Sequence, residues 1–483
     1  MVGGIVMKKA VIILAFGALA LACSKIGSTP AEDIVPLPDG YITITATADG
    51  SGDTKVQLTT GSAANKMQLI WSATDRIGVY TPDSNEPFTL SSGSMSATAL
   101  FTGAGADIYT PCTDGGWSAL YPYQPYEDAR LVGDSENGDN HGCYLNAYQR
   151  ATEGSFDRNS FLMLAHSATL GNFSFKPLVA LLKVTPQFDC KQIYLTARQP
   201  SGTYVRISGG TAFYWNSGDP SMVAAPANYL SSNSTSIILS GNIEAGKDYY
   251  MCVYPMEMPE GFDLSFVATD GTRYVRGTGK SFTPARGRIY DMGEFSIAGT
   301  SWTQTIAAPD ANGHTCVDLG FVHDGKKLYF ADRNLGASDI DLLGDTYYWG
   351  DVNPSPSTDY YKPGSNMDIG GNVSYDAATN NWGGDWRIPG VSHLNLLYYD
   401  FPSTRFLSID WDTSRATNGN TFTSSIPGYE GTAIFIPDGQ YWTSEYYKSS
   451  GRYYCLSAHE TISSWSVYSP NAAYQPIRPV IFK

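Results

Sequence analysis

Alternation of apolar and polar residues with a period of two is the feature that most constrains this chain. It is clearest in Tyr41–Ala48 (YITITATA), where every second residue would face the same side of an extended strand. Long stretches with the 3.6-residue period of a helix are hard to find. The 49 glycines and 27 prolines supply many turns between segments rich in Val, Ile, Thr and Tyr. The sequence therefore predicts a mainly β protein.

The first 23 residues have the organisation of an export signal. Met7-Lys8-Lys9 is a basic start, and residues 10–21 form an apolar run that is too short to span a bilayer. Cys23 follows this run, so the segment resembles a bacterial lipoprotein signal, in which that cysteine is lipidated. An ordinary cleaved signal with a chance cysteine is the alternative. Residues 24–40 are rich in Ser, Pro and Gly and predict a tether. We expect an exported lipoprotein at the outer membrane or cell surface.

Composition argues against several classes of function. With 483 residues, the chain can form two or three domains. Its net charge of -15 disfavours nucleic-acid binding, which needs clustered Lys and Arg. The sequence contains no G-x-S-x-G, H-E-x-x-H, P-loop or dinucleotide motif. We therefore predict a protein that is not an enzyme and uses no cofactor.

Six cysteines remain after Cys23, and none forms the C-x-x-C pair that is typical of a zinc site. An exported protein can carry disulfides. Six cysteines allow fifteen connectivities. Sequence order suggests the one with a bridge in each predicted domain, which is Cys112–Cys143, Cys190–Cys252 and Cys316–Cys455. Cys190 and Cys252 could equally be buried free thiols.

A series of motifs follows the first predicted strand. A loop with basic residues leads to an apolar segment, Met67–Trp71, and then to Asp75–Tyr80 (DRIGVY). Trp117–Tyr123 and the apolar segment Phe173–Val184 come later. In this order the motifs resemble the N-terminal domain of fimbrillins, pilus subunits that certain anaerobic Gram-negative bacteria export as lipoproteins.

Further short strands are predicted between turn residues, at 192–196, 236–239, 249–254, 262–267 and 274–276. Gly246–Pro255 and Arg288–Gly293 are similar to strands of the second fimbrillin domain. The resemblance implies two tandem β-sandwich (transthyretin-like) domains, over residues 41–170 and 171–298. Residues 299–312 would be a linker.

Residues 313–483 have a different set of motifs. These are VDLG (317–320), ADRNLGA (331–337), YYWG (347–350), WRIP (386–389), YWTSEYY (441–447) and IRPV (477–480). In this order they resemble a paralogous bacterial domain family, and the resemblance implies an α+β C-type lectin-like domain. A helix at Val391–Tyr399 and paired strands at 439–444 and 453–456 are predicted. The calcium-binding loop of sugar-binding lectins is absent, so no metal is expected.

The fimbrillin resemblance also implies a mode of assembly. In that family a protease cuts after a basic residue and removes the first strand, and a strand of the next subunit fills the groove. This is β-augmentation, in which an open edge takes a foreign strand. Here the removable strand would contain Tyr41, Ile42, Ile44 and Ala46, and the cut would follow Lys55 or Lys66. A permanent first strand is the alternative.

Aromatic residues crowd the last third of the chain. Trp349, Trp386 and Trp442 are predicted to be buried. Two tyrosine pairs lie in polar loops and are the candidates for binding a glycan or protein ligand: Tyr360, Tyr361, Tyr446 and Tyr447.

Together these features predict a pilus (fimbria) tip subunit. It would accept a donor strand from a neighbouring pilus subunit and present residues 313–483 as an adhesive head, because a lectin-like domain stands where a stalk fimbrillin carries its donor tail. An outer-membrane-anchored lipoprotein that binds glycan is the second interpretation. An enzyme with a metal or a reactive Cys455 is a less favoured third.

Overall fold

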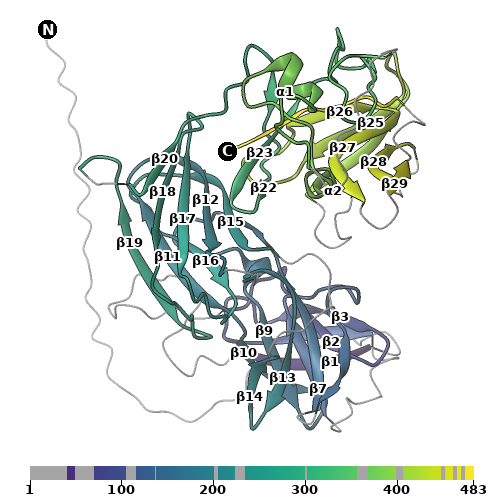
Figure 1. Cartoon of the computed structure of the whole chain (residues 1–483). Helices are drawn as coiled ribbons and strands as arrows, with labels where there is room; N and C mark the ends of the chain where they lie inside the picture. Colours follow the sequence, from purple (N-terminus) through teal and green to yellow (C-terminus); the bar gives the residue numbers. More distant parts are fainter. Residues whose placement is uncertain are drawn as a thin grey trace, which may run out of the picture. The chain divides into compact units, whose positions relative to one another are not determined.

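Strands dominate the computed structural model of this chain, and the mainly β prediction is confirmed (Figure 1). The structure describes residues 41–48, 70–104, 116–135, 138–200, 205–223, 234–299, 302–355, 368–398, 406–447, 452–460, 465–468 and 474–483. Within these residues, no helix is long and apolar enough to cross a membrane.

Seven strands near the N-terminus close a barrel in the order β1-β10-β9-β5-β2-β3-β4. Their bounds are β1 (Tyr41–Ala48), β2 (Arg76–Tyr80), β3 (Asn85–Ser92), β4 (Thr98–Ala104), β5 (Trp117–Tyr121), β9 (Met163–Ser167) and β10 (Asn172–Pro177). The strand predicted at Tyr41–Ala48 is confirmed with the same bounds. The sandwich expected here is corrected to a barrel, because β1 pairs with β4 on one side and β10 on the other.

Two further sheets share a core. One has the order β20-β18-β17-β12-β15-β8, and the other has the order β16-β11-β19. Leu181, Ile193 and Phe266 are buried in a single apolar cluster that both sheets line. The strands predicted between residues 192 and 276 are confirmed. The bounds are β8 (Tyr148–Arg150), β11 (Ala180–Pro186), β12 (Cys190–Ala197), β15 (Ser236–Ile243), β16 (Tyr249–Val253), β17 (Phe262–Ala268), β18 (Arg273–Thr278), β19 (Ile289–Phe295) and β20 (Gln304–Ile306).

The sheets do not follow the predicted boundary between residues 170 and 171. Strand β8 precedes this boundary but pairs with β15, whereas β10 follows it and belongs to the barrel. A fourth sheet contains strands from both sides of the predicted boundary, in the order β14-β13-β7-β6. The bounds of these strands are β6 (Leu131–Ser135), β7 (Gly138–Leu145), β13 (Gly209–Asn216) and β14 (Asp219–Met222). The short 3₁₀ helix η1 (Arg158–Ser160) precedes β9. Strand β20 lies inside the segment predicted as a linker.

The C-terminal part combines three small sheets with two short helices, α1 (Ala377–Trp382) and α2 (Val391–Tyr398). The predicted helix is confirmed as α2, and the predicted strand pair as β27 and β28. The strands are β21 (Cys316–Val317), β22 (Val322–His323), β23 (Lys326–Ala331), β24 (Leu407–Asp412), β25 (Gly419–Ser424), β26 (Ala433–Pro437), β27 (Gly439–Tyr447), β28 (Arg452–Ala458), β29 (Trp465–Tyr468) and β30 (Val480–Phe482). Strand β30 pairs with β23.

Motif residues build the core of this C-terminal part. Arg478 is fully buried and donates hydrogen bonds to Asn334 Oδ1 (2.8 Å) and to the carbonyl oxygens of Ala331 (3.1 Å) and Phe435 (2.8 Å). These bonds connect the IRPV motif to the ADRNLGA motif. The prediction that Trp349, Trp386 and Trp442 are buried is confirmed, and each indole N–H donates to a backbone carbonyl.

Candidate functional site

Strand β1 completes the barrel by filling the space between two strands that do not pair with each other. Residues Tyr41–Thr47 pair antiparallel with β4, and Thr45–Ala48 pair parallel with β10. Both backbone edges of β1 are therefore used. Without β1, the facing edges of β4 and β10 would present unpaired N–H and C=O groups, which are a template for another strand.

The side chains of β1 follow the predicted alternation. Ile44 and Ala46 are 1% and 0% exposed and lie in the core, and Ile42 packs at its margin. On the outer face, the hydroxyls of Thr43 and Thr47 bond to threonine hydroxyls of β4 at 3.3 and 3.1 Å. Of the residues predicted for the removable strand, only Tyr41 does not contribute to the core, since it is 47% exposed.

Trp71 holds β1 from inside the barrel. Its indole Nε1 donates to the carbonyl oxygen of Ala46 in β1 at 3.2 Å and to that of Ala97 at 3.0 Å. The ring packs edge-to-face on Phe101 of β4 and Phe175 of β10, with centroids 5.1 and 5.7 Å apart. A single side chain thus contacts β1 and both of its neighbours. Residues 70 and 71, at the end of the apolar segment Met67–Trp71, lie outside any strand.

A buried polar cluster fixes the turn that follows Trp71. Asp75 accepts hydrogen bonds from Arg158 Nη2 (2.6 Å), from the hydroxyl of Tyr121 (3.1 Å) and from the backbone N–H of Ser72 (2.6 Å). Burial raises the pKa of Tyr121 far above its ordinary value, and the nearby Asp75 raises it further, so this hydroxyl stays a donor. The cluster positions the Trp71 ring against β1.

The residues predicted for lipidation and protease processing, Cys23, Lys55 and Lys66, lie outside the described residues. Lys55 and Lys66 both fall in residues 49–69, between β1 and Ile70. That segment is the covalent connection from β1 to the following strands of the barrel. After a cut within it, β1 would be held in the barrel by its pairing and packing alone.

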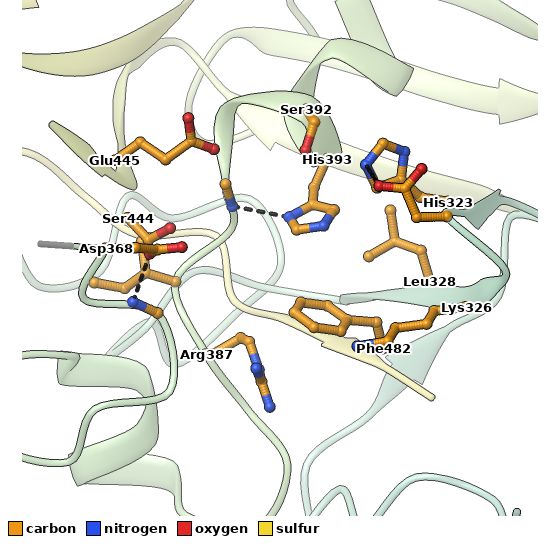
Figure 2. Close-up of a pocket in the computed structure, with 14 residues that line it drawn as sticks. His323, Lys326, Leu328, Asp368, Arg387, Ser392, His393, Ser444, Glu445 and Phe482 are labelled. Atoms are coloured by element: carbon orange, nitrogen blue, oxygen red, sulfur yellow. Dashed lines mark hydrogen bonds and ion pairs between the residues drawn. The ribbon is translucent and has the colours of Figure 1, made fainter. Parts of the chain in front are cut away.

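A cavity of about 250 Å³ lies in the C-terminal part (Figure 2). Its lining comes from five segments: the turn between β22 and β23, residues 368–370, the WRIP motif with the start of α2, β27, and β30. In Figure 2, Glu445, Ser444 and Asp368 lie on one side, and Arg387, Phe482 and Lys326 lie along the other.

Three carboxylates line the cavity, those of Asp324, Asp368 and Glu445, and the last two are held by backbone N–H groups. Glu445 Oε1 accepts from the N–H of Val391, the first residue of α2, at 2.8 Å. Asp368 Oδ1 accepts from the N–H of Gly370 at 3.0 Å. Burial raises the pKa of Glu445, and the charge of Asp368 raises it further. Asp368 and Glu445 each keep a second oxygen that can accept a hydrogen bond.

The cationic side is organised around Phe482. The Arg387 guanidinium lies 4.3 Å from the centre of the Phe482 ring, and Lys326 Nζ lies 5.5 Å from it. The Nε atom of Arg387 is buried and has no hydrogen-bond partner. The pKa of His393 is lowered to about 3, first by burial and then by His323, Arg387 and Lys326. Its Nδ1 accepts from the N–H of Gly390 at 2.9 Å, so the neutral ring carries its proton on Nε2.

Of the predicted ligand residues, the structure describes the side chain of Tyr446 alone, and Tyr446 is not among the residues that line this cavity. Tyr360 and Tyr361 lie outside the described residues, as does the side chain of Tyr447. Tyr446 is half-buried, and its ring centre lies 5.2 Å from that of Tyr453. The cavity could not be predicted from the sequence, because the charged residues that line it are far apart along the chain and share no local spacing.

The predicted disulfides are corrected, because Cys143, Cys190, Cys252, Cys316 and Cys455 are all free thiols. Cys190 lies in β12 and Cys252 in β16, which belong to different sheets. Packed sheets are about 10 Å apart, whereas a disulfide needs Cα atoms within about 7 Å. Burial raises the pKa of Cys190 to about 12. Cys112, the predicted partner of Cys143, lies outside the described residues.

In the part of the chain that the structure describes, no three His, Cys, Asp or Glu residues are grouped to hold a metal.

No protein-family model and no curated protein matches the chain. Solved structures similar to it include a candidate cell adhesion protein from Bacteroides uniformis, with 18% identity and a TM-score of 0.30 over 56% of this chain and 99% of that one. A second candidate cell adhesion protein, from Bacteroides ovatus, has 14% identity and a TM-score of 0.32 over 55% and 96%. A fimbrial protein from Bacteroides ovatus has 12% identity and a TM-score of 0.21 over 91% and 97%.

Proposed function

We propose that this chain is a pilus subunit at the bacterial surface, in which a strand of a neighbouring subunit replaces β1 and the C-terminal part acts as an adhesive head. The observation that carries the proposal is the position of β1, the first strand along the chain, between β4 and β10 in a closed barrel. The order of fimbrillin-like motifs from Tyr41 to Gly293 supports the same assignment.

The site left by β1 would suit a strand with a defined pattern. The positions of Ile44, Ala46 and Ala48 face the core, so an incoming strand needs small or branched apolar residues at alternate positions. The outer positions are threonines, which tolerate polar residues. The incoming strand would run parallel to β10 and antiparallel to β4, as β1 does.

The proposed position at the filament end is consistent with the way residues 480–483 are built into the C-terminal part. Strand β30 pairs with β23, and Phe482 packs against His393 with ring centres 4.8 Å apart. The backbone N–H of Lys483 bonds to the carbonyl of Lys327 at 3.0 Å. Residues 480–483 thus form part of the C-terminal sheet, and their backbone groups are not free to pair with another subunit.

The second candidate is a lipid-anchored surface protein that keeps β1 permanently and binds glycan. The bonds from Trp71 to Ala46 and the use of both edges of β1 favour it, because they make β1 an integral strand. Sequencing the N-terminus of the mature surface protein separates the two. A start at Cys23 favours the anchored protein, and a start after Lys55 or Lys66 favours strand replacement.

The proposed function is tested by immunogold electron microscopy of native cells with an antibody raised to residues 313–483. Label at the ends of thin filaments is the expected result. Label spread over the cell surface, with none on filaments, would contradict the assignment to a pilus.

A further inference from the structure

We propose that the cavity around Arg387 binds a sugar residue that carries a carboxylate, such as a hexuronic acid or a sialic acid. The inference rests on the adhesive role proposed above, and it names the ligand class and the residues that would recognise it. It is carried by the separation of Arg387 and Lys326 from Asp368 and Glu445 across the cavity, and by the mixture of donors and acceptors on the lining.

Asp324 lies 3.4 Å from His323 at the edge of the cavity, but the two permanent cations of the lining are not paired with the other two carboxylates. Among the described residues, neither Arg387 nor Lys326 lies within ion-pair distance of Asp368 or Glu445, although all four side chains line the same cavity. Elsewhere in the C-terminal part, such groups pair directly: Arg415 binds Asp412 at 2.8 Å, for example. Charges held apart across a cavity can each bind a different group of one ligand.

Arg387 has the geometry of a carboxylate receptor. Its Cζ lies over the Phe482 ring, 4.3 Å from the ring centre, and no described residue accepts a hydrogen bond from its guanidinium. A planar guanidinium binds a carboxylate through two parallel N–H···O bonds, and these charge-assisted bonds are among the stronger ones in proteins. Lys326 lies on the same side and adds positive charge near the same ligand group.

The opposite side is suited to hydroxyl groups. Asp368 and Glu445 each offer a free carboxylate oxygen as an acceptor, whereas the Nε2–H of His393 is a donor. A sugar hydroxyl both donates and accepts, so neighbouring hydroxyls can satisfy this mixed set. An ammonium group only donates and would leave the histidine N–H without a partner. This difference favours a sugar acid over an amino acid.

The size of the cavity limits the ligand to about one sugar residue. Its volume of about 250 Å³ lies just below the roughly 300–1,000 Å³ of sites for drug-sized ligands. Gly390 contributes to this space, because a Cβ there would lie 2.7 Å from Glu445 Oε1. The remaining sugars of a longer glycan would extend into solvent.

The proposal is tested by isothermal titration calorimetry on the purified full chain. The probes are glucuronic acid, galacturonic acid and N-acetylneuraminic acid, with glucose, galactose and glutamate for comparison. We expect at least one sugar acid to bind at least tenfold more tightly than the neutral sugars and glutamate. Arg387→Gln should weaken that binding by at least tenfold. The matched control is Arg415→Gln, which removes an arginine stacked on Phe435 at 4.4 Å outside the cavity and should leave binding unchanged.

A second variant separates a lost ligand contact from a folding defect. Asp368 is exposed, so Asp368→Asn should leave the thermal unfolding temperature unchanged and weaken sugar-acid binding several-fold. Equal binding of neutral sugars, binding of glutamate alone, or no binding of any probe would overturn the inference. Because calorimetry on the free chain does not require filaments, these outcomes leave the filament-labelling test of the proposed function unaffected.

Discussion

The indole Nε1 of Trp71 donates a hydrogen bond to the carbonyl oxygen of Ala46, 3.2 Å away, and so connects the first strand to the residue that follows the 49–69 segment. The same N–H lies 3.0 Å from the carbonyl of Ala97. This contact would survive a cut between residues 49 and 69, because both partners lie outside that segment. Retention of β1 after cleavage would therefore depend on Trp71 as well as on strand pairing.

Replacement of Trp71 by Phe should loosen β1 selectively. The variant keeps an aromatic ring but loses the donor to Ala46 and Ala97, which should lower the free energy of opening of β1 by about 1–2 kcal/mol. Hydrogen-exchange mass spectrometry of the peptide containing residues 41–48 measures this directly. Trp302→Phe is the matched control, because the buried Nε1 of Trp302 has no partner to lose. Equal effects of the two substitutions on β1 would contradict the role given to Trp71.

The inner face of β1 should carry most of its packing energy. Ile44→Ala is expected to cost about 2–4 kcal/mol, because Ile44 is 1% exposed and a cavity would remain. Thr43→Ala, on the outer face of the same strand, should cost under about 1 kcal/mol. Exchange of the β1 amides measures both values. Similar costs at the two positions would show that β1 is not packed as described.

Arg478 should be indispensable for the C-terminal part. Arg478→Met removes the donors to Asn334, Ala331 and Phe435 and leaves buried acceptors without partners, at a cost of about 3 kcal/mol or more. Arg333→Met, which removes a partly exposed pair with Asp332, should cost about 1 kcal/mol or less. Urea unfolding followed by exchange of the 474–483 peptide distinguishes them. A stable Arg478→Met variant would contradict the structural role of the IRPV motif.

The stability of the C-terminal part should fall as the pH drops below about 6.5. The pKa of His393 is about 3 in the folded chain and near 6.5 when unfolded, so the unfolded state binds one more proton between these values. From pH 7 to pH 5 the expected loss is about 2 kcal/mol. His393→Gln should remove this part of the loss, measured by urea unfolding at both pH values. His459→Gln, at a more exposed histidine, is the control. An unchanged pH dependence in His393→Gln would show that this ring is not held neutral by burial.

Local patterns in the sequence predicted the strands well and their long-range pairing less well. The alternation in Tyr41–Ala48 is a property of eight adjacent residues, and its strand has the predicted bounds. Closure of the barrel depends on pairing between Thr45 and Asn172, which are far apart along the chain, so the sequence indicated a sandwich instead. The boundary at residue 170 was misplaced for the same reason, since β8 joins the sheet of β15.

The candidate site was only partly predictable. The strand itself follows from its alternation, and the hypothesis that it is removable follows from the fimbrillin resemblance. The cavity could not be predicted, because Lys326, Asp368, Arg387 and Glu445 come together only after four separate segments have folded. Arg387 and Glu445 lie in motifs that the sequence did single out, but their spacing gives no indication that they face one cavity.

Replacement of β1 by a foreign strand can be observed as peptide exchange after cleavage. The full chain is cut with a lysine-specific protease within residues 49–69, and a fluorescent peptide with the sequence of Tyr41–Ala48 is added. Two controls are used. The first is a peptide of the same composition without the alternation, and the second is a full chain that carries both Lys55→Gln and Lys66→Gln. We expect the cut chain to release β1 and to incorporate the alternating peptide, while neither control exchanges. Retention of β1 by the cut chain without incorporation, or unfolding of the barrel on cleavage, would contradict strand replacement.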